Sequence, residues 1–389
     1  MLAKRMQNLG TETAFAVLAR AKALEAEGRD IVHLEIGEPD FDTPQNVIDK
    51  GVWALQNGYT HYGPAAGLPD VRKVFAEHIA RDRGIDVTAE NVVIVPGGKP
   101  IIFFPLLALV DPGDEVVYPN PGFPIYESMI KFLEAKAVPL PLREENDFSF
   151  DIEDLKVRVS DKTKMLIINS PQNPTGGVLA SSDLDAIAEL ALKHDFWVLS
   201  DEIYSQIVYD GTHDSISTRP GMLERTIILE GHSKTYAMTG WRLGYGIMPV
   251  TLADAVAKLQ TNCTSCTAAF TQVAGAEALT GPQDAVRAMV AEFKVRRDLL
   301  VDGLNAIEGV SCKRPRGAFY VFANISELGL TSKQVEQKLL DDFGVAALAG
   351  TSFGAEGEGF LRFSYANSQD NIKKALSRFA EFVAAVRNG

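Results

Sequence analysis

GHSKTYAMTGWRLGY, residues 231–245, is the stretch that indicates both the fold and the chemistry of this chain. It follows the aliphatic and β-branched run 226–229 (TIIL), which is typical of a short buried strand. We therefore expect Lys234 at the carboxyl end of a strand, with Ser233 before it and Arg242 eight residues after it. An amine there suits condensation with a carbonyl, and a nearby guanidinium suits phosphate binding. The two together suggest pyridoxal 5'-phosphate as the cofactor.

The alternative for Lys234 is a solvated surface charge, because most lysines are exposed. Its neighbours Tyr236, Met238 and Trp241 make the segment more apolar than a solvent-exposed loop. Partial burial and a nearby cation both lower the pKa of an ammonium, so that more of the amine is free to react. These neighbours favour the catalytic reading.

The composition argues against several classes of partner. The chain has 389 residues, 46% hydrophobic and 23% charged, so we expect an ordinary globular protein of about two domains. Its 38 basic and 51 acidic residues give a net charge of -13, which argues against nucleic acid or an anionic membrane as the main partner. There is no signal-peptide pattern and no run of about 18 apolar residues, so we expect a soluble, cytoplasmic protein.

The cysteines and histidines predict neither a disulfide framework nor a metal site. Cys263, Cys266 and Cys312 are too few for such a framework in a chain of this length. The six histidines show no metal-ligand spacing, so we expect no metal. We interpret the pair Cys263 and Cys266 as structural, with a redox or metal role as the alternative.

Short apolar runs alternate with helical segments from residue 91 onward, which predicts a mostly parallel, doubly wound α/β sheet. The runs are 92–95, 115–118, 165–168, 197–200, 226–229 and 244–248. Ligands bind beyond the carboxyl ends of the strands in such sheets. Gly97, Asn173, Asp201 and Lys234 all come just after a predicted strand, so we expect them at one edge. Glycines before the helix 101–109 also suit phosphate binding by backbone N–H groups, although many such turns bind nothing.

The last quarter of the chain predicts a smaller α+β domain that packs with the N-terminal segment. Its strands are expected at 317–325, 345–348 and 360–365. Arg362 interrupts the last apolar run. An exposed arginine on an edge strand is one interpretation, and a buried guanidinium that binds a carboxylate bidentately is the other.

Several motifs together resemble one known family across essentially the whole chain. They are IGEPDFDTP (36–44), YGPAAGLPDVR (62–72), PGGK (96–99), NSPQNPTGG (169–177), SDEIY (200–204), SKTYAMTGWRLGY (233–245), GAFYVF (317–322) and LRFSYA (361–366). The sequence resembles the class I and II aminotransferases of fold type I, close to bacterial aspartate aminotransferases of the prokaryotic subgroup. The resemblance implies an N-terminal segment (1–45) packed with the small domain, a large cofactor-binding domain (46–284) and a small C-terminal α+β domain (285–389).

The resemblance assigns roles around the cofactor ring. Lys234 is similar to the lysine that binds the cofactor covalently and then moves the α-proton of the substrate. Asp201 is similar to the partner of the pyridinium nitrogen, which keeps the ring electron-accepting. Tyr204 and Asn173 resemble the pair that hydrogen-bonds the O3′ atom of the ring.

The resemblance also assigns the phosphate contacts. Ser233 and Arg242, with the backbone around Gly98 and Lys99, are similar to the residues that bind the cofactor phosphate. Tyr62 corresponds to the tyrosine that reaches this phosphate from the neighbouring subunit. A homodimer with shared active sites is therefore implied.

The substrate side of the resemblance is less uniform. Arg362 corresponds to the arginine that binds the substrate α-carboxylate, with Gly37 and Asn173 beside it. Phe123 stands where dedicated aspartate enzymes carry a tryptophan near the ring, and phenylalanine has no N–H donor. The segment QTNCTSCT (260–267) has no arginine, although one branch of the family supplies one there for the distal carboxylate. Two alternatives follow. Either another basic residue binds the distal carboxylate, or the substrate is an aromatic or aliphatic amino acid.

These observations predict an L-amino acid:2-oxo acid aminotransferase with a ping-pong reaction. Glutamate and 2-oxoglutarate are expected as one pair, and aspartate or an aromatic or aliphatic amino acid as the other substrate. A β- or γ-lyase on the same fold is the alternative, because fold does not fix reaction type. A cofactor-binding regulator would need a DNA-binding region, for which residues 1–40 are too short. The expected partners are small molecules, with no nucleic acid and no membrane.

Overall fold

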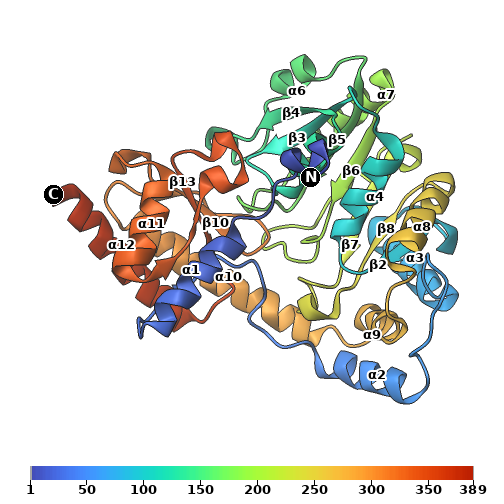
Figure 1. The fold of residues 1–389 in the computed structure, drawn as a ribbon, viewed down its shortest axis with the longest axis horizontal. Coiled ribbons are helices and arrows are strands. Elements are labelled where there is room, and N and C mark those ends of the chain that lie inside the picture. The colour runs from blue at the N-terminus through green and yellow to red at the C-terminus, as the bar shows by residue number, and fades with distance from the viewer. Residues whose placement is uncertain (1, 389) are drawn as a thin grey trace.

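The computed structural model describes residues 2–388, and a seven-stranded sheet forms its larger part (Figure 1). The strand order is β2-β8-β7-β6-β5-β3-β4. The strands are β2 (Val92–Val95), β3 (Glu115–Asn120), β4 (Lys136–Pro141), β5 (Thr163–Asn169), β6 (Trp197–Asp201), β7 (Thr226–Gly231) and β8 (Gly244–Ile247). The block from β4 to β7 is parallel, whereas β8 runs antiparallel to both of its neighbours.

Helices cover both faces of this sheet because alternate strand residues point to opposite sides. Val93 and Val95 pack toward α4 (Lys99–Leu109), α5 (Ile125–Phe132) and α8 (Val250–Thr264). Val92 and Ile94 pack toward the opposite face. The helices on that face are α2 (Gln45–Gln56), α3 (Pro69–Arg83), α6 (Ile152–Arg158), α7 (Ser181–His194) and α9 (Ala269–Thr280). The predicted doubly wound, mostly parallel α/β fold is confirmed.

Strand β4 is missing from the strands that the sequence predicts. Its sequence, KAVPLP, contains Pro139 and Pro141, and proline cannot donate a hydrogen bond to a neighbouring strand. The structure accommodates both prolines because β4 is the last strand of the sheet and pairs on one side only. The two prolines are therefore the reason that the sequence did not predict this edge strand.

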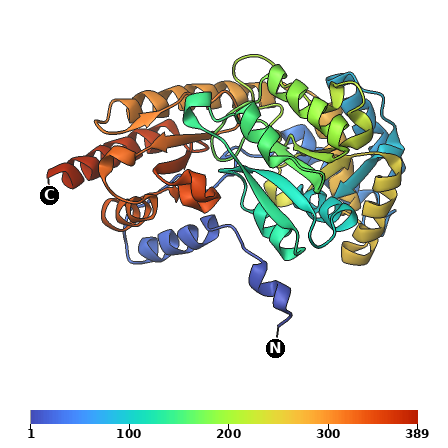
Figure 2. The same ribbon diagram turned by 90° about the horizontal axis from the view of Figure 1, so that it is seen from above.

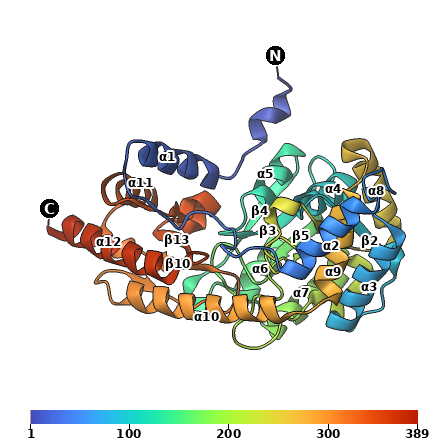
Figure 3. The same ribbon diagram turned by 90° about the horizontal axis from the view of Figure 1, so that it is seen from below.

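The C-terminal part contains a four-stranded antiparallel sheet with the order β12-β13-β10-β9. Its strands are β9 (Ser311–Cys312), β10 (Tyr320–Asn324), β12 (Leu348–Ala349) and β13 (Phe360–Ser364). Residues of α10 (Asp284–Asn305), α11 (Ser332–Phe343) and α12 (Gln369–Asn388) pack into the core of this small sheet. In Figures 1 and 3, α10 runs from α9 to this small sheet.

The N-terminal residues are joined to the small sheet. Helix α1 (Ala14–Ala26) buries Val17, Ala21 and Leu24 in a cluster with residues of β10, β11 and β12. Strand β1 (Val32–His33) pairs in parallel with β11 (Val345–Ala346). The domain boundaries expected after residues 45 and 284 stay a prediction. Within residues 2–388, none of the helices has the length and apolar character needed to cross a membrane.

Candidate active site

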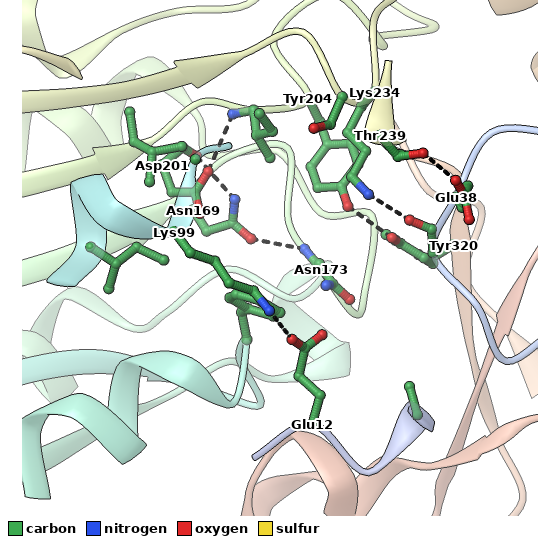
Figure 4. Close-up of a pocket in the computed structure, with 18 of the residues that line it drawn as sticks. Glu12, Glu38, Lys99, Asn169, Asn173, Asp201, Tyr204, Lys234, Thr239 and Tyr320 are labelled. Carbon is green, nitrogen blue, oxygen red and sulfur yellow. Dashed lines mark hydrogen bonds and ion pairs between the residues drawn. The ribbon is translucent and has the colours of Figure 1, made fainter. Parts of the chain in front are cut away.

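The carboxyl ends of the central strands open into a cavity of about 460 Å³ that also receives residues of the small sheet (Figure 4). Strand β5 ends at Asn169 and β6 ends at Asp201, and these two residues are paired in register. Strand β7 ends at Gly231, so the chain turns into the cavity just before Lys234. Arg362 and Tyr320 reach the cavity from the small sheet. The site therefore lies where the two sheets meet.

Lys234 is a partly buried amine in this cavity. Its Nζ atom donates a hydrogen bond to the carbonyl oxygen of Gly37 at 2.5 Å. Burial lowers the pKa of Lys234 to about 8, while the carboxylates of Glu38 and Glu12 act in the opposite direction. More of the amine is therefore neutral near physiological pH than for an exposed lysine, which favours attack on a carbonyl.

Asp201 is a buried carboxylate held by neutral donors. Its Oδ2 atom accepts a hydrogen bond from the Tyr126 hydroxyl at 2.6 Å, and Oδ1 accepts one from the Ile203 backbone N–H at 3.3 Å. Burial raises the pKa of Asp201 to about 6, although the Tyr126 hydrogen bond opposes this shift. A cation brought next to this carboxylate would stabilise its ionised form and be stabilised by it.

Two residues that follow strands of the large sheet, Tyr204 and Asn173, contact side chains of the small sheet in this cavity. The hydroxyls of Tyr204 and Tyr320 are 2.7 Å apart. Asn173 donates its backbone N–H to Asn169 Oδ1 at 2.9 Å and accepts a hydrogen bond from Arg362 at 3.1 Å. These contacts fix the tyrosine hydroxyls and the Asn173 amide at the wall of the cavity.

Arg362 is buried on a central strand of the small sheet, with only 4% of its surface exposed. Its guanidinium carbon lies 4.5 Å from the ring centre of Tyr320 and 4.9 Å from that of Phe353. Its Nη2 donates to the Glu35 carbonyl oxygen, and its buried Nε has no hydrogen-bond partner in the structure. The interpretation as an exposed arginine on an edge strand is therefore wrong. A buried cation with a free donor suits an incoming carboxylate.

The strand-to-helix turn before α4 forms an anion-binding surface. Gly97 has a φ of 84°, and a Cβ atom there would collide with the Arg242 guanidinium. Gly98 precedes the first residue of α4, so the positive end of that helix faces the cavity. Ser233 and Arg242 line the same cavity. Backbone N–H groups, a hydroxyl and a guanidinium are the donors that a phosphate requires.

The outer part of the cavity carries an aromatic wall and an ion pair. The Phe123 and Tyr126 rings are 5.7 Å apart in an edge-to-face arrangement. The ammonium of Lys99 lies 5.7 Å from the Phe123 ring centre and forms an ion pair with Glu12 (Figure 4). Lys99 therefore contributes to the cavity in two ways. Its backbone N–H stands at the start of α4, and its side chain adds a cation to the outer part of the cavity.

Every predicted site residue except Tyr62 lines this cavity. Tyr62 is 90% exposed and lies outside it in the single chain that the structure describes. The sequence did not indicate Glu12, Tyr126, Asn169 or Tyr320. Asn169 and Tyr320 stand within motifs that were recognised, whereas no sequence pattern pointed to Glu12 or Tyr126.

These parts fit pyridoxal phosphate. A reactive amine matches its aldehyde, a buried carboxylate matches its ring nitrogen, and the surface before α4 matches its phosphate. The free donor of Arg362 is left for the carboxylate of an amino acid. The fold and the site define a pyridoxal-phosphate-dependent enzyme that acts on amino acids.

Comparison with known proteins specifies the family. The model of the family described as "Aminotransferase class I and II" matches residues 29–379. The chain is 38% identical to an aspartate aminotransferase of Musicola paradisiaca, over 98% of this chain and 96% of that protein. It is 41% identical to a probable aspartate/prephenate aminotransferase of Thermus aquaticus, over 98% of both chains. The solved aspartate aminotransferase of Thermus thermophilus with maleate superposes with a TM-score of 0.93, at 39% identity and 98% and 99% coverage.

The chain therefore belongs to the class I and II aminotransferase family. It is an aminotransferase, and its cofactor is pyridoxal 5'-phosphate.

Proposed function

We propose that this aminotransferase acts on amino acids with two carboxylates, with L-glutamate and 2-oxoglutarate as one pair and L-aspartate and its 2-oxo acid as the other. The observation that supports this proposal is the Lys99 ammonium, a cation of the cavity besides Arg362 and the residues assigned to the cofactor. Arg362 lies at the small sheet, and Lys99 lies at the outer part of the same cavity, so two carboxylates of one substrate each find a cation. The relatives named for aspartate agree with this choice.

Arg362 binds the α-carboxylate of the substrate in this proposal. Its unpaired Nε and its contact with Asn173 leave one side of the guanidinium for a bidentate interaction. Gly37 and Arg362 both contact Tyr320, because a Cβ atom at Gly37 would collide with the Tyr320 hydroxyl and the guanidinium lies over the Tyr320 ring. The Gly37 carbonyl oxygen also accepts a hydrogen bond from Lys234. The α-carboxylate can therefore approach the backbone closely, which orients the amino group toward Lys234.

The cofactor contacts are proposed from the same geometry. Asp201 holds the ring nitrogen, and Tyr204 and Asn173 hold the oxygen of the ring. Phe123 packs on the ring. Tyr126 positions Asp201 by its hydrogen bond.

Ser233, Arg242 and the backbone of Gly98 and Lys99 bind the phosphate. These donors surround the positive end of α4. They hold the cofactor in place through the reaction.

Proton transfer is assigned to Lys234. When bound, pyridoxal phosphate supplies an aldehyde that takes up the amino group and a ring that withdraws electrons from the substrate Cα. The neutral Nζ atom of Lys234 would accept the α-proton of the substrate and hold it for the second proton transfer of the half-reaction. A pKa lowered to about 8 places this amine close to the range that general base catalysis favours.

A homodimer is proposed from the exposed residues near Tyr62. The exposed apolar side chains Val52, Trp53 and Leu55 lie on α2, and Tyr62, which is 90% exposed, follows this helix in the chain. An exposed apolar patch of this kind is typical of an interaction surface. In a dimer, Tyr62 would reach the phosphate of the neighbouring site. A cytoplasmic location stays a prediction.

The test is a single half-reaction. The cofactor-loaded protein is mixed with one amino acid at a time, without a 2-oxo acid, and the cofactor absorbance and the products are followed. We expect L-glutamate and L-aspartate to convert the cofactor to pyridoxamine phosphate with one equivalent of 2-oxo acid. L-phenylalanine, L-alanine and L-leucine should react more slowly. Continuous release of ammonia would instead show a lyase.

The Lys99→Met variant tests the substrate class in the same assay. It should lower kcat/KM for L-aspartate and L-glutamate about 10- to 100-fold, as expected when one partner of a close charge pair is removed. The values for L-alanine should stay within about twofold, because this substrate has no second carboxylate. An equal loss for all substrates would reject Lys99 as the residue that binds the distal carboxylate.

A further inference from the structure

The segment of residues 9–13, which we call the N-terminal strap, links the two parts of the molecule and contributes Glu12 to the cavity lining. It joins η1 (Lys4–Asn8) to α1, and Figures 2 and 3 show these as separate helices linked by extended chain. On the large-sheet side, Gly10 N–H donates to Ser128 Oγ of α5 at 2.9 Å, and Ser128 Oγ donates to the Gly10 carbonyl at 3.1 Å. On the other side, α1 is packed into the small-sheet core. The strap is therefore held at both ends.

Glu12 is the charged residue of this strap, and it points into the cavity. Its carboxylate forms an ion pair with the Lys99 ammonium, and both residues line the cavity (Figure 4). The Glu12 side chain is 20% exposed and that of Lys99 is 49% exposed. The pair is thus close to the substrate but still in contact with water. Such a pair is weak enough to be exchanged for another one.

The position of the pair at the start of α4 explains why a carboxylate is favoured there. Lys99 is the first residue of this helix, whose positive end attracts anions and repels the ammonium. Glu12 compensates for that repulsion while the cavity holds no substrate anion. A distal carboxylate of a substrate would meet the same ammonium and the same helix end, and it would also be repelled by Glu12.

We infer that Glu12 is a specificity-determining residue that competes with the distal carboxylate of an acidic substrate for Lys99. This inference rests on the proposed function, in which Lys99 binds that carboxylate. A dicarboxylic amino acid must replace Glu12, whereas an amino acid with an uncharged side chain leaves the Glu12–Lys99 pair intact. The pair therefore lowers the preference for acidic substrates and keeps Lys99 neutralised when an apolar side chain occupies the cavity. An unpaired ammonium beside an apolar side chain would disfavour its binding.

The test measures equilibrium binding of two ligands that lack an amino group and therefore do not react. Succinate carries two carboxylates, and butyrate is the matched ligand with one. Their dissociation constants for the cofactor-loaded enzyme are measured by calorimetry. The Glu12→Gln variant should bind succinate about three- to tenfold more tightly, because one competing ion pair and one repulsion are removed. Its affinity for butyrate should stay equal or fall by up to about twofold.

The Ser128→Ala variant is the control for a loosened strap. It removes the hydrogen bonds to Gly10 but leaves Glu12 and Lys99 unchanged. We expect its affinities for succinate and butyrate to change together, by less than about twofold. If Glu12→Gln also shifted both ligands equally, its effect would come from the strap, and the inference would be overturned.

The Lys99→Met variant separates this inference from the proposed function. Succinate should bind this variant about tenfold more weakly or worse, with little change for butyrate. If succinate binding did not change, Lys99 would not bind the distal carboxylate, and both the proposed function and the inference about Glu12 would be rejected. If succinate weakened here but Glu12→Gln left its affinity at the original value, only the inference about Glu12 would fall. Steady-state kcat/KM for L-aspartate and L-phenylalanine should move in opposite directions in Glu12→Gln.

Discussion

Two groups of charged residues lie on opposite faces of the same strand ends. In the cavity, among the residues that the structure describes, Lys234 forms no ion pair and donates only to the Gly37 carbonyl oxygen, and Arg362 keeps an Nε without a hydrogen-bond partner. On the other face, Arg83 at the end of α3 is enclosed by carboxylates. Its Nε donates to Glu202 at 2.9 Å and its Nη2 donates to Glu230 at 2.6 Å.

The two groups share their strands residue by residue. Asp201 faces the cavity, and the next residue, Glu202, faces Arg83. Although burial opposes it, His213 and Arg83 hold the pKa of Glu202 well below its ordinary value. Burial raises the pKa of Asp201 to about 6, and it also raises that of Glu230 to about 7, although Arg83 opposes the second shift. The last residue of β6 and the residue after it thus place one carboxylate in the cavity and the next in the ion pairs of Arg83.

Removing the cavity amine should have the largest effect on activity and a small one on stability. Lys234→Ala should lower kcat more than about 10⁴-fold, because both the nucleophile and the proton acceptor are lost. The melting temperature without cofactor should not fall by more than about 2 °C, since a buried ammonium is removed. Kinetics and calorimetry on the same sample check this. Substantial activity in the variant would contradict the role of Lys234.

Removing Arg83, the cation of the group on the other face, should instead have a large effect on stability and a small one on activity. Arg83→Met leaves Glu202 and Glu230 buried without their guanidinium, which should cost about 3–5 kcal/mol in the free energy of unfolding. Lys73→Met on the same helix is the control, because Lys73 forms an exposed pair with Glu77 worth at most about 1 kcal/mol. Urea denaturation measures both. Equal losses in the two variants would show that Arg83 has no special role.

Removing Arg362, the proposed partner of the substrate α-carboxylate, should have an intermediate effect on activity, and this effect should be confined to substrate binding. Arg362→Ala should raise KM for every amino acid about 30- to 1000-fold, because it removes the buried guanidinium that we propose to bind the α-carboxylate. Cofactor binding, measured by its absorbance after dialysis, should remain. An unchanged KM for all substrates would mean that the α-carboxylate binds elsewhere.

The lowered pKa of Lys234 predicts a pH dependence of cofactor attachment. Only the neutral amine attacks the aldehyde, and its fraction grows as the pH rises through the pKa of about 8. The rate of covalent attachment to the cofactor-free protein should therefore rise about tenfold from pH 7 and level off near pH 9. Stopped-flow absorbance measures this rate, with N-acetyl-lysine as a control for titration of the cofactor itself. A rate that still rose tenfold per pH unit above pH 9 would indicate an ordinary lysine.

The sequence predicted the large sheet because its strands are aliphatic runs buried on both faces. It did not predict the direction of β8, since an apolar run reads the same in either direction. It missed β4 because Pro139 and Pro141 are unusual in strands.

Most of the candidate site could be predicted because its residues follow strand ends or stand in recognised motifs. Tyr126 and Glu12 could not, because their contacts with Asp201 and Lys99 join elements 75 and 87 residues apart in the chain. Such contacts depend on how helices pack, which no local pattern records. The Arg83 group was missed for the same reason. Tyr62 stays a prediction, since its role requires a second chain.

The antiparallel strand β8 has a consequence for how the site can vary. Gly231 at the end of β7 pairs with Gly244 at the start of β8, so the loop that carries Ser233, Lys234 and Arg242 is closed by the sheet itself. A Cβ atom at Gly244 would lie 2.7 Å from the backbone of Gly97, so the turn before α4 packs directly against the same loop. The loop between β7 and β8 and the turn before α4, which we propose to bind the cofactor, are thus joined to one another through the sheet. Mutations that broaden or narrow the substrate range can accumulate in the strap and the small sheet without changing this loop and this turn.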